Sequence, residues 1–153
     1  MKLHLGDTVS YQAVDYRARG VIDYSLGDRT LRLVAIAHDG QVHFVEPVVV
    51  ADRVLLLTEI EPLDIAAPPP ATIYHDGESY LLKLSGEAEV DVAGEADGRQ
   101  TGDCKIWRFR AAGGQYLQIE NWPDRLRMLA GTAVHKGMLE IRPATDEPPP
   151  VLP

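Results

Sequence analysis

The chain has 153 residues, of which 45% are apolar and 25% charged, a composition typical of a soluble globular protein. Its 15 basic and 23 acidic residues give a net charge of −8, which disfavours binding to nucleic acid phosphates or to an acidic lipid surface. The length allows one domain, or two small ones that would have to bury a face against each other.

Apolar and polar residues alternate with a period of two along most of the chain, which predicts β-strands. The first predicted pair surrounds the turn at Asp39-Gly40, and a further strand is expected within 50–61, where β-branched residues favour strand over helix. The strands predicted after these are at 80–84, 87–92, 106–111 and 115–120. Asp-Gly and Gly-Gly pairs between the strands are typical of tight hairpins. The sequence therefore predicts an all-β, antiparallel fold with little helix.

Two triple-proline runs, at 68–70 and 148–150, divide the chain. Proline cannot donate to a sheet ladder or continue a helix, so both runs are expected to be extended. The predicted organisation is a first β repeat at 1–65, a proline linker at 66–71, a second β repeat at 72–143 and an extended proline-rich tail at 144–153.

The two halves resemble each other. A Gly-Gln pair lies at a hairpin turn in each, at 40–41 and 114–115, each hairpin reaches a glutamate, and an Asp-Arg pair with an apolar strand follows. This pattern predicts an internal duplication, against the alternative that two unrelated hairpins look alike. The halves would pack as a sandwich or as paired, partly open barrels, because each is small for a stable core.

Glu46 and Glu120 occupy equivalent positions in the two halves. Two such carboxylates facing each other could bind a cation, either a polyamine or a metal ion. The alternative is that each glutamate pairs with the arginine that follows it, Arg53 or Arg125. Trp122 lies in a loop and is either a partner contact or packed in the core. These five residues are the candidate ligand or partner contacts.

No motif for catalysis or for a cofactor is present, so no catalytic residue, metal ligand or cofactor is predicted. Cys104 is the only cysteine, which excludes an intrachain disulfide, and it is expected to be a small buried residue. Arg108 and Arg110 are expected on a solvated strand face, as partners of an acidic stripe formed by Glu87, Glu89 and Asp91, and the alternative is that the two arginines form an anion site. Trp107 and Phe109 would then lie on the core face.

One set of residues resembles a known family. The pattern consists of Gly77-x-x-Tyr80, Gly86-x-Ala88-x-Val90-x-x-x-Gly94, Trp107-x-Phe109, Leu117-x-Ile119-Glu120-x-Trp122 and Gly131-x-x-Val134. It resembles the bacterial domain-of-unknown-function family 4178 over most of the chain. The resemblance implies a β-rich bacterial domain without an established activity, with relatives in gene clusters that encode spermidine-synthase-like enzymes and membrane-stress proteins.

The leading functional prediction is a non-catalytic protein-binding or assembly domain that docks through the edges or loops of its sheets. The alternative is a small-molecule or cation-binding accessory protein in polyamine or envelope-stress metabolism. An enzyme is less favoured, and a homo-oligomer stays open. The first residues carry Asp7 and no apolar stretch of signal-peptide length, and the apolar runs are far shorter than the roughly 20 residues that a bilayer requires. We therefore expect a cytoplasmic protein without membrane insertion.

Overall fold

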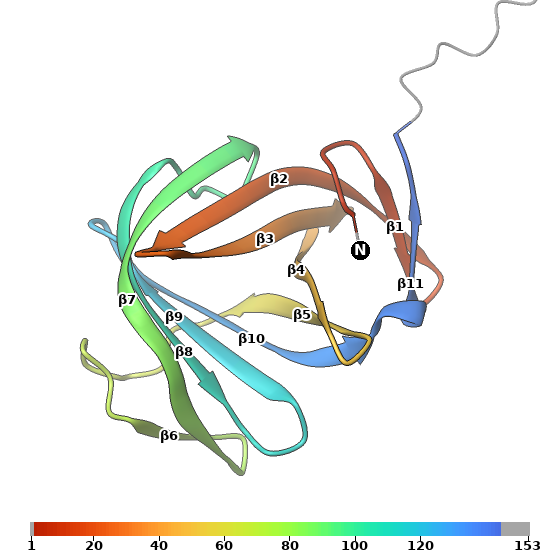
Figure 1. The fold of residues 1–153 in the computed structure, drawn as a ribbon. Coiled ribbons are helices and arrows are strands. Elements are labelled where there is room, and N and C mark those ends of the chain that lie inside the picture. Colours follow the sequence, from red (N-terminus) through yellow and green to blue (C-terminus); the bar gives the residue numbers. More distant parts are fainter. Residues whose placement is uncertain (1, 145–153) are drawn as a thin grey trace, which may run out of the picture.

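The computed structural model describes residues 2–144, apart from the side chains of residues 48–50, and has an all-β architecture (Figure 1). Within this range there are eleven strands and one short 3-10 turn, η1 (Lys136–Met138). The strands are β1 (Thr8–Tyr11), β2 (Val14–Leu26), β3 (Arg29–His38), β4 (Gln41–Val50), β5 (Arg53–Ile60), β6 (Thr72–His75), β7 (Glu78–Gly94), β8 (Gly102–Arg110), β9 (Gln115–Asn121), β10 (Leu126–His135) and β11 (Leu139–Arg142). None of the described residues forms a helix that is long and apolar enough to span a membrane.

Eight of these strands close into a barrel. Neighbours follow the order β2-β3-β4-β5-β10-β9-β8-β7, and β7 then pairs with β2 to complete the circle. The remaining strands extend the sheet outside the barrel: β1 and β11 beyond β2, and β6 beyond β7, on opposite sides of the molecule (Figure 1). All neighbours are antiparallel, so β3 and β5 begin, and β8 ends, at the same end of the barrel. The connection between β7 and β8, residues 95–101, lies at the other end.

The closure between β2 and β7 depends on two glycines. Gly20 pairs with Gly94, and the Glu95 amide donates a hydrogen bond of 2.7 Å to the Arg19 carbonyl oxygen beside them. A Cβ atom on Gly20 would lie 2.1 Å from the Glu95 carbonyl oxygen, and one on Gly94 would lie 2.3 Å from the Arg19 carbonyl oxygen. The two backbones approach this closely because neither residue has a side chain.

Three apolar clusters form the core. The first fills the barrel interior and includes Ile22 and Phe44 from the first half of the chain and Ile106 from the second. The second lies on the outside of β3, β4, β5 and β10, where β1, the start of β2 and β11 cover them. The third lies under β6 and the start of β7. Strands covered on both faces bury consecutive residues, as in β8, where Ile106, Trp107 and Phe109 are all buried. This double covering explains why several strands read as apolar on both faces.

The prediction of an all-β fold with little helix is confirmed, as is the strand expected within 50–61, which is β5. The hairpin at Asp39-Gly40 also forms, and both residues adopt the positive φ values, 47° and 80°, that a tight two-residue turn requires. The predicted sandwich or paired open barrels are not confirmed, because the strands of both halves close one barrel instead.

Internal duplication and the division of the chain into two repeats stay predictions. Strands β1–β5 fall within 8–60 and β6–β10 within 72–135, so the stretch 61–71, which contains the proposed linker, carries no strand. Of the tail predicted at 144–153, all but residue 144 lies outside the described residues.

Candidate functional site

A carboxylate with four hydrogen-bond donors lies at the centre of the barrel. Glu120 on β9 is fully buried, and its Oε1 accepts from Arg99 Nε at 2.9 Å and from Trp122 Nε1 at 2.8 Å. Its Oε2 accepts from the Tyr24 hydroxyl at 2.8 Å and from Gln118 Nε2 at 2.9 Å. Burial and the neighbouring carboxylate raise the pKa of Tyr24 well above its ordinary value, so the phenol stays protonated and keeps donating.

The hydrogen bonds continue from Glu120 towards the end of the barrel where β8 ends. Gln118 Oε1 accepts from Arg108 Nε at 3.1 Å and from Arg108 Nη2 at 2.6 Å. Arg108 Nη1 in turn donates to Glu46 Oε1 at 2.7 Å. Glu46 and Glu120 therefore belong to one hydrogen-bonded network without touching each other.

The network also continues towards the opposite end. Arg99 Nη1 lies 3.3 Å from Glu59 Oε1, and Arg127 donates to both oxygens of Glu59, at 2.7 and 2.8 Å. Burial alone would raise the pKa of Glu59, but the hydrogen bonds from Arg127 and the charge of Arg99 outweigh burial and lower it. The Glu59 carboxylate therefore stays charged at neutral pH.

Residues 95–101 plug this end of the barrel. Ala96 packs in the interior cluster, and the Arg99 side chain is fully buried, with its guanidinium carbon 4.8 Å from the centre of the Phe44 ring. The segment is anchored by Arg127 Nη2, which donates to the Asp97 carbonyl oxygen at 2.7 Å. A hollow of about 470 Å³ beside this plugged end carries charges of both signs, among them Arg125, Asp103 and Asp124.

Positive side chains gather at the other end of the barrel, which we call the basic mouth. It is formed by four exposed residues: Arg29, Arg53, Lys83 and Arg110. Arg29 and Arg53 begin β3 and β5, Arg110 ends β8, and Lys83 lies in the first part of β7. Two hollows of about 400 and 480 Å³ open there and share Glu46, Arg110 and Tyr116 as lining residues. The first hollow is also lined by Arg29, Lys83 and the buried Arg108, and the second by Arg53.

The exposed cations of the basic mouth lack carboxylate partners among residues 2–144. None of the ion pairs found there involves Arg29, Arg53, Lys83 or Arg110, whereas Arg108 beneath them is neutralised by Glu46. The Arg110 guanidinium carbon lies 5.8 Å from the centre of the Tyr116 ring, a cation–π arrangement that restricts the arginine. The chain as a whole has a net charge of −8, so this unneutralised positive cluster distinguishes the basic mouth electrostatically from the rest of the molecule.

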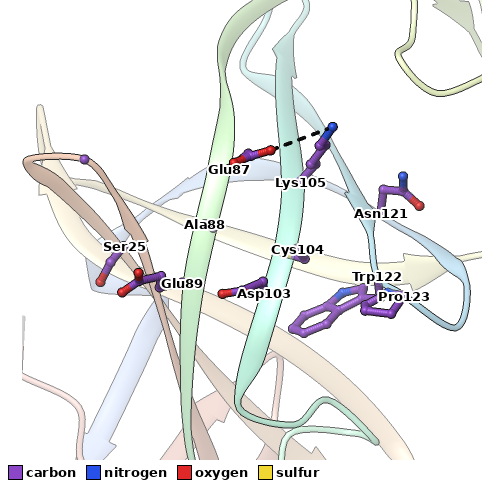
Figure 2. Close-up of a pocket in the computed structure, with 11 residues that line it drawn as sticks. Ser25, Glu87, Ala88, Glu89, Asp103, Cys104, Lys105, Asn121, Trp122 and Pro123 are labelled. Carbon is purple, nitrogen blue, oxygen red and sulfur yellow. Dashed lines mark ion pairs between the residues drawn. The ribbon is translucent and has the colours of Figure 1, made fainter.

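The outer wall formed by β2, β7 and β8 is acidic. A hollow of about 670 Å³ lies on this wall and is lined by the exposed Glu89 and Asp103. Figure 2 shows its lining residues, among them Glu87, which forms an ion pair with Lys105 at 3.8 Å. No group of three or more His, Cys, Asp or Glu residues that could hold a metal ion occurs in the described part of the chain.

Cys104 beneath this wall is buried as predicted, and burial raises its pKa to about 12, so its thiol is unreactive at neutral pH.

The predicted contact residues take different places from those expected. Glu46 pairs with Arg108 and Glu120 with Arg99, so the predicted pairing with Arg53 or Arg125 is wrong. Arg53 lines the basic mouth, and Arg125 lines the hollow at the plugged end. Trp122 is buried, which agrees with the core alternative, and it donates to Glu120. Whether any of the five contacts a ligand or a partner stays a prediction.

The prediction for Arg108 is wrong as well. It was expected on a solvated face beside Arg110, but it is 7% exposed and lies in the barrel interior with Ile106. Both faces of β8 are covered, so alternation could not distinguish the outside from the inside. Sequence reasoning missed Arg99 entirely, because Asp97-Gly98 before it indicates only a turn. Trp107 and Phe109 are buried as expected, in the cluster under β6.

Comparison with known proteins gives one finding. The model of a family described as "Domain of unknown function (DUF4178)" matches residues 4–136, which include every strand of the barrel and confirm the resemblance seen in the sequence. No curated protein and no solved structure matches the chain.

Proposed function

The chain belongs to the DUF4178 family, and from that premise we propose that it is a non-catalytic binding domain that takes up an anionic partner at the basic mouth. The observation that carries this proposal is the set of four exposed cations around two adjoining hollows, without carboxylate partners in the described chain. Like charges held together repel each other, and an anion bound between them relieves that repulsion. The same field raises the rate at which an anion arrives.

The state of the carboxylates in the hydrogen-bonded network favours binding over turnover at the basic mouth. General acid–base chemistry needs a carboxylate or histidine that can reach a substrate. Glu120 is fully buried and accepts four hydrogen bonds, and Glu59 is held by two arginines. Glu46, which does line the basic mouth, is engaged by Arg108.

The same contacts argue against the cation-binding alternative. A polyamine or metal ion between Glu46 and Glu120 would have to displace arginines that already neutralise both carboxylates. Removing one partner of a buried ion pair is strongly unfavourable, because it leaves an uncompensated charge. The positive charge of the basic mouth would also repel a cation.

Thermal unfolding at constant ionic strength tests the proposal. The probes are citrate, pyrophosphate and hexaglutamate as anions, and spermidine and Mg²⁺ as cations. We expect at least one anion to raise the Tm in a saturable way and the cations to leave it unchanged, because a ligand that binds only the folded state stabilises it. Failure of all three anions, or stabilisation by spermidine, would overturn the proposal.

Matched variants locate the site. In Lys83→Gln/Arg110→Gln, two positive charges of the basic mouth are removed, and the anion-induced rise in Tm should disappear. The control is Arg32→Gln/Lys105→Gln, which removes two exposed positive charges from other faces of the barrel. Each variant is compared with and without anion, so a change in its own stability cancels. If both double variants lose the effect equally, the anion responds to net charge and not to the basic mouth.

A further inference from the structure

The basic mouth divides into two parts joined by one arginine. Arg29 and Lys83 line only the first hollow, Arg53 lines only the second, and Arg110 lines both. Glu46 lies on the shared wall, where its charge cancels that of Arg108. Recognition of negative groups is therefore left to the exposed cations, which lie on either side of this neutral pair.

We infer that the ligand of the basic mouth is a small molecule with at least two negatively charged oxyanion groups, one for each hollow, rather than an acidic segment of another protein. This inference rests on the proposed function. Phosphate and carboxylate groups share the chemistry that these side chains recognise, since a guanidinium donates to either as a two-pronged fork.

The size of the hollows favours a small molecule. At about 400 and 480 Å³ they fall within the range of pockets that hold metabolite-sized ligands. A stable interface with a protein buries about 1,200–2,000 Å² in total, which extends well beyond such a mouth. The wall beyond the mouth includes Glu87, Glu89 and Asp103, which would repel an acidic partner surface.

Arg110 is positioned in advance of binding. Its guanidinium lies against the half-buried Tyr116 ring, and Tyr116 packs against the barrel interior. A side chain that is already restricted loses less conformational freedom when a ligand arrives. Because Arg110 borders both hollows, it can contact both negative groups of one ligand, and the structure makes it the residue on which two-group recognition depends most.

Titration calorimetry on the full chain at constant ionic strength tests this inference. Pyrophosphate and citrate are the probes with several negative groups, phosphate and acetate are the matched single-group probes, and hexaglutamate represents an acidic protein segment. We expect pyrophosphate, citrate or both to bind at one site per chain, about tenfold or more tightly than the single-group probe of the same chemistry, since one additional charged contact contributes that much. Comparison of pyrophosphate with citrate shows whether phosphate or carboxylate is preferred.

Single substitutions give the second part of this test. Arg110→Gln should weaken binding of the preferred probe about tenfold or more, and Tyr116→Leu should weaken it less, whereas Lys105→Gln on the outer wall should leave it unchanged. Circular dichroism of each variant shows whether the barrel is intact. A loss in Arg110→Gln with a folded barrel supports the inference.

The remaining outcomes separate the two proposals. Binding of hexaglutamate without binding of pyrophosphate or citrate would overturn the small-molecule inference and leave the proposed function standing. Equal affinity for single-group and multiple-group probes would overturn the two-group inference alone. Absence of binding by every anion would overturn both.

Discussion

Replacing Glu120 by glutamine removes the negative charge at the centre of the polar network while keeping the shape of the side chain. Glu120 accepts four hydrogen bonds, and a glutamine has one carbonyl oxygen, so its amide group would face two donors. Arg99, whose side chain is fully buried, would also lose the nearer of its two carboxylate partners. Both effects act in a barrel interior where water cannot compensate.

The expected cost follows from these contacts. Breaking a buried ion pair by removing one partner costs about 3–5 kcal/mol, and each lost hydrogen bond to a charged group contributes about 1.5–3 kcal/mol of that. We therefore expect Glu120→Gln to lower the free energy of unfolding by about 3–5 kcal/mol, which for a domain of this size corresponds to a fall in Tm of roughly 10 °C. This is a large part of the roughly 5–15 kcal/mol by which a domain is stable.

Urea unfolding at pH 7, followed by tryptophan fluorescence, measures the effect, because both Trp107 and Trp122 are buried. Glu87→Gln on the outer wall is the control, since its ion pair with Lys105 is exposed, and it should leave the midpoint unchanged. The double variant Glu120→Gln/Arg99→Met should be more stable than Glu120→Gln alone, because it removes the buried arginine charge that is otherwise left with only its more distant carboxylate partner, Glu59. If Glu120→Gln lowers the free energy of unfolding by less than about 1 kcal/mol, the inference that Glu120 compensates the buried charge of Arg99 is refuted.

Three further predictions concern other parts of the barrel. The lowered pKa of Glu59 means that its ion pairs stabilise the fold fully above the pKa of unfolded glutamate, and that this stabilisation is lost as the pH falls through the lower pKa of the folded state. Glu59→Gln should therefore be less stable than the natural chain at pH 7, and the difference should shrink as the pH is lowered towards 2.5, as measured by urea unfolding. Cys104 should react with a thiol reagent at pH 8 only when urea unfolds the chain, because it is buried and its folded pKa is about 12. Gly131→Ala should lower the Tm strongly or prevent folding, since a Cβ atom there would lie 1.9 Å from the Leu56 carbonyl oxygen, while Gly102→Ala, with nothing within 4 Å, should not.

Each of these three has a result that would contradict it. A difference between Glu59→Gln and the natural chain that persists undiminished at pH 2.5 would show that charge is not the source of the effect. Rapid labelling of Cys104 in the folded protein would mean that the barrel wall opens readily. A Gly131→Ala variant as stable as Gly102→Ala would mean that β5 and β10 can separate at that point without cost.

Much of the fold could be predicted from the sequence because hairpins are local. Asp39-Gly40 and Asp76-Gly77 adopt the positive φ values that their residue types favour, and the alternating segments beside them became strands. Closure of the barrel could not be predicted in this way. It depends on pairing between β2 and β7, whose partners Gly20 and Gly94 are far apart in the chain, and alternation carries no information about such distant partners.

The candidate site was predicted only in fragments. The sequence indicates Glu46 and Glu120 through their equivalent positions, and Arg53 through the Asp-Arg pair that follows Glu46. The partners of the two glutamates nevertheless come from another strand and from a loop. Arg99 reads as an ordinary loop residue, because its burial results from residues 95–101 folding into the barrel. Besides Arg53, the sequence indicates only Arg110 of the basic mouth, through the less favoured anion site with Arg108. The members of the basic mouth are scattered between residues 29 and 110, and only the closed barrel brings them to one end.

The closed circle of strands also fixes when the protein can complete its fold during synthesis. Strand β5 gains its second neighbour only when β10 has been made, and residues 20–25 of β2 wait likewise for β7, so the early strands keep open edges for much of translation. Contacts between such distant segments slow folding, and open strand edges invite pairing with other chains. Strand β1 pairs early with β2 but waits longest for its second neighbour, because β11 ends at residue 142. The emerging chain is therefore most exposed to aggregation before the last barrel strand leaves the ribosome.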